Sequence, residues 1–202
     1  MPKIVDHDQY RRELLLKAFD LFAERGYGSL TMRHLADGLG VSTGTLYHYF
    51  QSKEDVFLKL MEELARQDFM EVESALAAGG ETLEERMRAV FAWVAHKEDT
   101  LLKQLLISIS FYQEQHNSHD LVENSPLLAT INEGYSHLSQ TYLGIRDPDL
   151  IHFIDSLICG IVLNRVLCPH SIPIERHGRL FSRMLKTYLE TTHTDPPDLA
   201  PG

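Results

Sequence analysis

The sequence predicts an all-α protein of about nine helices, and three observations support this fold class. Apolar residues recur at intervals of three and four along most of the chain, as they do on one face of a helix. Capping residues precede these apolar runs, and glycine or proline follows them. No segment alternates apolar and polar residues as a half-buried strand does, and no internal repeat of about 20 to 50 residues is found.

The N-terminal quarter predicts three helices separated by short turns. The first, over residues 9–25, ends at Gly26, a residue type that favours a helix C-terminus. Thr31 caps a short second helix, and Gly40 ends it because glycine tolerates a positive φ. Ser42 is the natural N-cap of a short third helix. Two short helices joined through a glycine and backed by a first helix describe a helix-turn-helix.

The rest of the chain predicts six further helices. A long fourth helix starts at the Ser52 cap and stops at the Gly79-Gly80 pair. The remaining helices start at the capping box Thr82-Leu83-Glu84-Glu85, at Thr100, at Ser125-Pro126, at Asp147-Pro148 and at Ile172-Pro173. Residues 116–124 are expected to form a loop, and the tail over 194–202 is expected to be unstructured.

The net charge of −10 is distributed unevenly. Residues 1–53 carry seven basic and six acidic residues, whereas residues 54–202 carry 12 basic and 23 acidic residues. A polyanion such as nucleic acid is attracted by a local excess of positive charge. We therefore expect any polyanionic partner to meet the N-terminal quarter.

The longest uninterrupted apolar stretch, over residues 157–163, is seven residues long. A membrane-spanning helix needs ~20 apolar residues, and the N-terminus lacks the apolar segment of a signal peptide. The sequence therefore predicts a soluble cytoplasmic protein without a membrane partner.

Two cysteines, Cys159 and Cys168, lie nine residues apart in an apolar region. This spacing matches neither a disulfide framework nor paired zinc ligands, so buried reduced thiols are expected. His116 and His119 are spaced closely enough to hold a metal, but no second pair of ligands accompanies them. We predict no metal and no cofactor.

The third helix has two distinct faces. Leu46 and Phe50 are four residues apart and turn inward together. The opposite face carries Thr43, Gly44, Tyr47 and His48. The small residues come first, so that the helix can approach a major groove closely, and the two long side chains reach its wall.

Many residues between Leu15 and Phe57 stand at fixed spacing. They are Ala18, Leu21-Phe22, Arg25-Gly26-Tyr27, Thr31-Met32-Arg33, Leu35-Ala36, Gly40-Val41-Ser42, Gly44-Thr45-Leu46-Tyr47, Tyr49-Phe50 and Ser52-Lys53-Glu54. This stretch closely resembles the DNA-binding domain of the TetR/AcrR family of bacterial transcriptional regulators. The resemblance implies an all-α homodimer whose C-terminal domain holds a ligand pocket and whose last two long helices pair with those of a second subunit.

The resemblance also suggests which residues meet DNA. Thr43, Gly44 and Tyr47 would face the groove, while Thr31, Tyr49 and Lys53 would lie nearer to phosphates. The full candidate set is Thr31, Arg33, Thr43, Gly44, Thr45, Tyr47, His48, Tyr49 and Lys53. Simpler roles remain open for some of them, because Thr31 caps a helix with or without DNA, Tyr49 can be half-buried and Arg33 can be solvent-exposed.

The candidate ligand pocket consists of aromatic residues and one methionine between the fourth and seventh predicted helices. They are Phe69, Met87, Phe91, Trp93, Phe111, Tyr112 and Tyr135. Residues of these types can line a pocket for a small-molecule effector of unknown identity, but at helical spacing they also fill an ordinary core.

The candidate dimer interface lies on the last two predicted helices. Its residues are Ile154, Ser156, Ile158, Gly160, Phe181, Met184, Leu185 and Tyr188. The eighth helix is apolar nearly all round and must be covered on two sides, by its own domain and by a second subunit. A fully buried central helix of a monomer is the alternative.

Together these features predict a DNA-binding domain over residues 1–53, a ligand-binding and dimerisation domain over 54–193 and a flexible tail over 194–202. The expected function is that of a ligand-responsive homodimeric repressor that binds a near-palindromic operator and is released by a small molecule. No nucleophile elbow, phosphate-binding loop or dinucleotide-binding glycine pattern supports an enzyme. A protein-interaction adaptor that keeps the helix-turn-helix but no longer binds DNA is the alternative.

Overall fold

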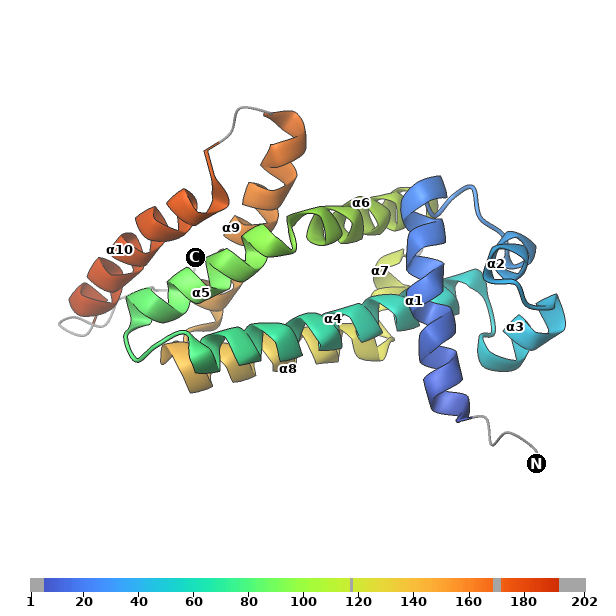
Figure 1. Cartoon of the computed structure of the whole chain (residues 1–202), viewed down its shortest axis with the longest axis horizontal. Helices are drawn as coiled ribbons and strands as arrows, with labels where there is room; N and C mark the ends of the chain where they lie inside the picture. Colours follow the sequence, from blue (N-terminus) through green and yellow to red (C-terminus); the bar gives the residue numbers. More distant parts are fainter. Residues whose placement is uncertain (1–5, 117, 169–171, 193–202) are drawn as a thin grey trace. The chain divides into compact units, whose positions relative to one another are not determined.

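The computed structural model describes residues 6–116, 118–168 and 172–192 of the 202-residue chain (Figure 1). Every regular element within these ranges is a helix, which confirms the predicted all-α class. They are α1 (His7–Arg25), α2 (Met32–Leu39), α3 (Thr43–Tyr49), α4 (Lys53–Ala78), α5 (Leu83–His96), α6 (Glu98–Glu114), α7 (Ser118–Glu123), α8 (Pro126–Leu138), the π-helix η1 (Ser139–Leu143), α9 (Pro148–Leu167) and α10 (Ile174–Thr192). The predicted tail over 194–202 lies outside the described residues.

The short helix α7 lies in the stretch that we expected to be a loop, which raises the number of α-helices in the described ranges to ten. Its polar sequence carries no clear helix signal. Leu121 and Val122, however, pack against the core formed by the N-terminal helices. Tertiary burial therefore supports a helical turn that the local sequence does not predict.

The predicted caps at four helix ends are confirmed, whereas the helix predicted to start at Thr100 begins at Glu98. Thr31 accepts a hydrogen bond from the backbone N–H of His34 at 3.2 Å, and Gly40 ends α2 in the left-handed region with a φ of 69°. Thr82 and Glu85 form a complete capping box at the start of α5. Asp147 caps α9 through the backbone N–H of Asp149 at 2.9 Å.

The chain divides into two compact units, Met1–Phe69 with Asp99–Tyr135, and Met70–Glu98 with Ser136–Gly202. The first unit therefore contains the start of α4 and most of α6 in addition to the three N-terminal helices. This division by packing differs from the expected boundary at residue 53, which remains a prediction about function.

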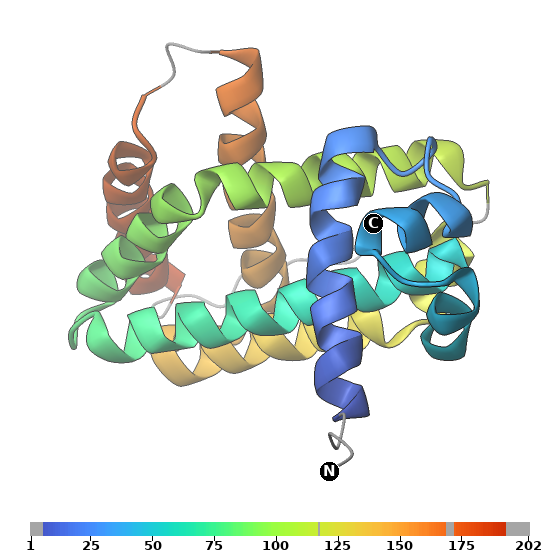
Figure 2. The same ribbon diagram turned by 45° about the vertical axis from the view of Figure 1, so that its right-hand side comes forward.

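The core of the first unit is aromatic. Phe57 of α4 stacks on Phe111 of α6 with ring centroids 4.3 Å apart, and Tyr27, in the turn after α1, lies edge-on to both rings. Phe22 of α1 completes the cluster. Figure 2 shows α1 running across α4 and α6, so the three N-terminal helices rest on a base made by two later helices.

In the second unit, α10 packs along α5 (Figure 1). Phe91 of α5 contacts Phe181 of α10 with ring centroids 6.1 Å apart. Phe181 is 6% exposed and Leu185 is 2% exposed. The prediction that these two residues face a second subunit is therefore wrong, because both fill the core of their own chain.

Among the helices that the structure describes, one, α9, is long and apolar enough by length and composition to cross a membrane, and only 11% of its most apolar 18 residues is buried. The same composition is found in soluble helices covered by other protein. Phe153, Val166 and Leu167 are 54%, 50% and 72% exposed on this helix. An apolar surface of this kind normally has a partner.

Candidate nucleic-acid interface

The third helix, α3, is fixed at its back and at its start. Leu46 is fully buried and Phe50, which follows its last turn, is 1% exposed. The Ser42 hydroxyl accepts a hydrogen bond from the backbone N–H of Thr45 at 2.9 Å. The backbone N–H of Val41 bonds to the carbonyl of Ala36 at 3.0 Å, which ties the turn to α2.

The opposite face of α3 lies in solvent. Thr43, Gly44 and His48 are exposed, and Tyr47 is 54% exposed. A Cβ atom on Gly44 would meet only the Ser42 hydroxyl, at an ordinary 3.7 Å. Nothing within the described structure therefore requires glycine at this position, whereas close approach of an outside partner would.

Three other candidates have structural roles or stand in solvent. The Thr45 hydroxyl lies 2.8 Å from that of Ser42, so it belongs to the cap of α3. Thr31 caps α2 in the same way. Arg33 is exposed beside that cap, where its guanidinium can reach outward.

Tyr49 is half-buried at the end of α3, and its hydroxyl lies 2.9 Å from Nδ1 of His7. The rings of His48 and Tyr10 pack edge-on against Tyr49, with centroids 5.0 and 5.6 Å away. His7 was not among the sequence candidates. It is the first residue of α1 and approaches α3 only through the fold, so no local signal could have placed it there.

Lys53, the first residue of α4, does not extend into solvent. Its ammonium donates a hydrogen bond to the backbone carbonyl of Tyr27 at 2.9 Å and lies 3.9 Å from the centre of the Tyr27 ring. Burial lowers the pKa of Lys53, against the opposing pull of the Glu54 and Glu114 carboxylates.

The comparisons with known proteins agree on one family. Residues 14–60 match "Bacterial regulatory proteins, tetR family". The transcriptional repressor KstR2 of Rhodococcus jostii is 39% identical over 147 residues, which cover 72% of this chain and 70% of that protein. The transcriptional repressor AcnR of Corynebacterium diphtheriae is 30% identical over 162 residues, which cover 75% of this chain and 78% of that protein. The chain belongs to the TetR family.

Solved structures show the same fold for the TetR-family chain. The transcriptional regulator FadR of Bacillus subtilis, crystallised in complex with stearoyl-CoA, superposes with a TM-score of 0.63 at 18% identity. The match covers 87% of this chain and 97% of that one. At this level of identity the likeness concerns the fold alone.

None of the seven candidate pocket residues of this TetR-family chain lines the cavity of about 510 Å³ described below. Met87, Phe91 and Phe111 are at most 1% exposed and fill the cores of their units. Phe69 instead pairs edge-on with Tyr135 at 5.1 Å. The remaining two lie at surfaces, where the Trp93 indole N–H donates to Glu71 at 3.0 Å and Tyr112 is 43% exposed.

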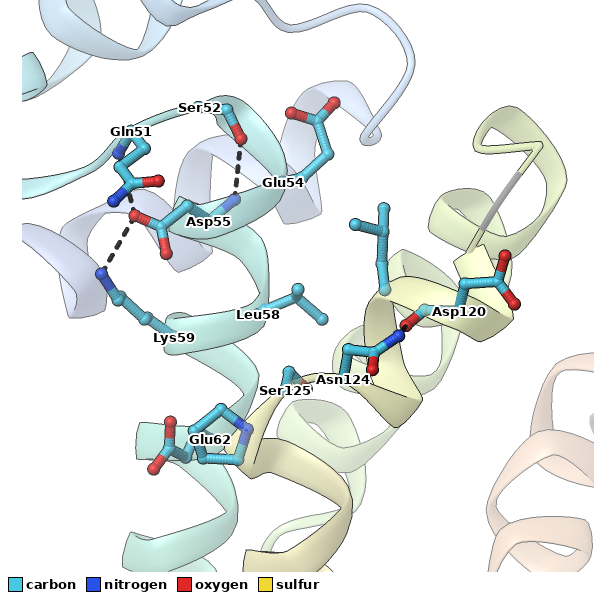
Figure 3. Close-up of a pocket in the computed structure, with 12 residues that line it drawn as sticks. Gln51, Ser52, Glu54, Asp55, Leu58, Lys59, Glu62, Asp120, Asn124 and Ser125 are labelled. Atoms are coloured by element: carbon cyan, nitrogen blue, oxygen red, sulfur yellow. Dashed lines mark hydrogen bonds and ion pairs between the residues drawn. The ribbon is translucent and has the colours of Figure 1, made fainter.

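A cavity of about 510 Å³ lies elsewhere in the first unit, between the start of α4 and the α7–α8 region (Figure 3). It is lined by Gln51, Ser52, Glu54, Asp55, Leu58, Lys59, Glu62, Asp120, Leu121, Asn124, Ser125 and Pro126. The Lys59 ammonium is paired with the Asp55 carboxylate at 3.0 Å. The sequence did not identify the residues that line this cavity, because they are mainly polar and resemble a solvent-exposed helix face.

Among the residues that the structure describes, no group of three or more His, Cys, Asp or Glu side chains could hold a metal ion. His119 instead packs against the Tyr112 ring, with centroids 5.2 Å apart. Cys159 is half-buried and Cys168 exposed, and neither forms a disulfide. Burial raises the pKa of the Cys159 thiol to about 11, which keeps it protonated.

Proposed function

We propose that this TetR-family protein is a transcriptional repressor that places α3 in the major groove of an operator. The observation that carries the proposal is the exposed face of α3. Thr43, Gly44 and Tyr47 lie on this face, whereas the opposite face of the helix is buried. The fold itself does not require glycine at position 44, and Tyr47, three residues later, carries a long aromatic side chain with a polar end. This combination suits close approach to base edges. The relatives named as repressors support the direction of regulation.

Residues around α3 are suited to positioning it on the sugar-phosphate backbone. Arg33 is exposed and charged, Thr31 is exposed at the start of α2, and His48 and Tyr49 form the last turn of α3. Contacts to phosphates fix the register of a recognition helix without reading sequence. The near-neutral charge of residues 1–53, beside a strongly acidic remainder, favours this part of the chain for a polyanion.

We propose further that the protein acts as a homodimer through α9 and α10. Leu180, Met184 and Tyr188 recur at a spacing of four on α10 and are 50%, 59% and 43% exposed. The two helices meet in the second unit, where the Phe153 ring of α9 lies 6.3 Å from the Phe181 ring of α10 between centroids. A second copy can cover both helices symmetrically, and a two-fold protein then requires a near-palindromic operator with half-sites about one helical turn apart, or a multiple of it.

The cavity beside α4 is the proposed site of the small-molecule effector. Its volume falls in the range of about 300 to 1,000 Å³ that is usual for small-molecule sites. Leu58, Leu121 and Pro126 provide apolar surface, while carboxylates outnumber the one ammonium among its lining residues. This lining suits an amphipathic molecule with a positively charged or hydrogen-bond-donating end.

The position of the cavity provides a route to the DNA-reading helix. Gln51 and Ser52, which line it, form the link between α3 and α4. A ligand can change DNA affinity only if it binds one arrangement of this link better than another. We expect the effector to favour an arrangement in which α3 no longer fits the groove.

Selection from a random duplex pool tests the DNA-binding proposal. The full-length protein should enrich a near-palindromic sequence, and Tyr47→Ala protein at equal folded concentration should not. Failure of the wild-type protein to enrich any duplex would instead favour the adaptor without DNA binding.

A thermal-shift screen of amphipathic amines tests the effector site. A compound that binds the cavity should weaken binding to the selected duplex, and the duplex should weaken the compound by the same factor. Asp120→Asn should reduce its affinity, whereas Glu123→Gln, on the same helix but outside the cavity, serves as the matched control. Equal compound affinities with and without DNA would contradict the proposed coupling.

A further inference from the structure

Three residues of the first unit form one connected cluster, which we call the Tyr27 clamp: Tyr27, Lys53 and Glu54. The Lys53 ammonium bonds to the Tyr27 carbonyl and covers the Tyr27 ring. The Tyr27 hydroxyl donates to a carboxylate oxygen of Glu54 at 2.9 Å. The first two residues of α4 therefore both contact one buried tyrosine in the turn between α1 and α2. Lys53 contacts its backbone carbonyl and ring, and Glu54 contacts its hydroxyl.

The electrostatics of the clamp are mutually supporting. Burial by itself would raise the pKa of Glu54, but hydrogen bonds from its own backbone, Ser52 and Tyr27, together with the Lys53 charge, lower it overall. Burial and the Glu54 bond raise the pKa of Tyr27, so its hydroxyl stays a donor. The Tyr27 hydroxyl therefore donates to the Glu54 carboxylate, while the Lys53 side chain covers the other side of the cluster.

The end of α6 supports the clamp from its other side. The backbone N–H of Tyr27 donates to the Ser110 hydroxyl at 3.3 Å, and Phe111 lies edge-on to the Tyr27 ring at 5.0 Å. A Cβ atom on Gly28 would lie 2.6 Å from the Glu114 carboxyl carbon, so this side chain lies directly against the turn. Tyr27 is held by α6 as well as by α4.

This arrangement disfavours a direct phosphate contact by Lys53. The carboxylates of Glu54 and Glu114 both act on its ammonium, so an approaching phosphate would meet negative charge as well. Reaching outward would also cost the hydrogen bond to Tyr27 and the contact with its ring. The resemblance to the family placed Lys53 near phosphates, whereas the structure engages its charge internally.

We propose that Lys53 is a positioning residue, which supports DNA binding through Tyr27 rather than by touching a phosphate. It begins α4 three residues after Phe50, where α3 has just ended. The contact between Lys53 and Tyr27 fixes the start of α4 and therefore the orientation of α3, which precedes it. This orientation decides how the exposed face of α3 meets the groove. This role rests on the proposed function.

A labelling experiment tests the clamp without DNA. The full-length protein is treated briefly with acetic anhydride, and acetylation of each lysine is quantified by peptide mass spectrometry. Lys53 should react more slowly than the exposed Lys17 and Lys103, and Tyr27→Leu, which removes the ring that the Lys53 ammonium covers, should speed its reaction. Equal reactivity of Lys53 and Lys103 in the wild-type protein would overturn the proposal.

A binding experiment separates positioning from phosphate contact. The probes are the duplex that the wild-type protein enriches and a random-sequence duplex of equal length, titrated over a range of salt concentrations well below the unfolding temperature. Lys53→Met should lower affinity for the enriched duplex by about tenfold, lower affinity for the random duplex less, and leave the salt slope unchanged. Tyr27→Leu, which removes the ring beneath Lys53, should act in the same direction although Tyr27 is 1% exposed, and Lys103→Met should have no effect.

Two results would overturn the positioning role. Equal losses on both duplexes, with a salt slope reduced by about 0.9, would show a phosphate contact. Unchanged affinities with only a lower unfolding temperature would show a purely structural lysine. Failure of the DNA-binding proposal would give a different result, because the wild-type protein would then enrich no duplex. The labelling experiment would still decide whether the Tyr27 clamp exists.

Discussion

Leu46 and Tyr47 are neighbours in α3 and lie on opposite sides of it, because Leu46 is fully buried and Tyr47 is 54% exposed. A helix turns by about 100° at each residue, which places adjacent side chains on different faces. Leu46 anchors the helix in the core of the first unit, and Tyr47 is presented to solvent. This relationship allows binding and stability to be changed separately.

The first prediction concerns this separation. Tyr47→Ala should weaken binding to the selected duplex by about 1 to 3 kcal/mol while leaving the unfolding temperature nearly unchanged. Leu46→Ala is the matched contrast and should destabilise the fold by about 2 to 5 kcal/mol. Fluorescence anisotropy and thermal unfolding measure the two quantities. Wild-type affinity in the Tyr47→Ala protein would show that α3 does not read DNA as proposed.

The second prediction concerns acid stability. The pKa of Glu54 is lowered from its ordinary value of 4.5 in the folded chain. The charged form of Glu54 therefore stabilises the fold at pH values above the pKa that Glu54 has in the unfolded chain. This stabilisation is lost as the pH falls through the lower pKa of Glu54 in the folded chain. Glu54→Gln removes the charge and should reduce the free energy of unfolding at neutral pH.

Urea unfolding between about pH 7 and pH 3 checks this expectation. The difference in unfolding free energy between the wild-type and Glu54→Gln proteins should shrink as the pH falls. Glu24→Gln, at an exposed carboxylate on α1, is the control for the change of carboxylate to amide. A difference that stays constant across the range would argue against a stabilising charge on Glu54.

The N-terminal helices could be predicted from sequence because their signals are local. Thr31, Gly40 and Ser42 act on backbone groups within a few residues of themselves, so residue type and spacing suffice. The two faces of α3 follow equally from helical periodicity. The position of α7 could not be predicted, because its helical turn depends on burial of Leu121 and Val122 against distant helices.

The rest of the candidate site depends on contacts between distant segments. The Lys53 ammonium bonds to a carbonyl 26 residues away in sequence, which no spacing rule identifies. Periodicity places Phe91 and Phe181 on apolar faces, but it cannot say whether such a face meets a ligand, a second subunit or the protein's own core. Both residues proved to belong to the core between α5 and α10.

The third prediction compares two glycines in the second unit. A Cβ atom on Gly178 of α10 would come within 2.5 Å of the Phe91 ring and 2.6 Å of its Cβ, so the two helices would have to move apart. Gly160 of α9 has no atom within 4 Å of the same position. Gly178→Ala should therefore destabilise the protein by about 1 to 3 kcal/mol through overpacking.

Gly160→Ala should instead stabilise the helix by about 0.5 to 1 kcal/mol, because alanine restricts the unfolded chain and suits a helix interior. Chemical unfolding at low protein concentration measures both variants on the same scale. Equal and small effects of the two substitutions would mean that α10 does not pack closely on Phe91.

The last prediction concerns the dimer. Met184 is 59% exposed on α10, and its apolar side chain lies between those of Leu180 and Tyr188, one helical turn to either side. Met184→Glu places a charge in the middle of the proposed interface, where its desolvation would not be offset by a partner. Sedimentation at micromolar concentration should show a wild-type dimer and a Met184→Glu monomer with wild-type helicity. This monomer should bind the selected duplex weakly, because only one half-site is engaged.

Met70→Glu, at a 70% exposed methionine on α4, is the matched control and should remain dimeric. Phe181→Glu should lower the unfolding temperature of the chain itself, since Phe181 is a core residue. A wild-type monomer, or a Met184→Glu protein that remains dimeric, would require a different cover for the apolar surface of α9 and α10.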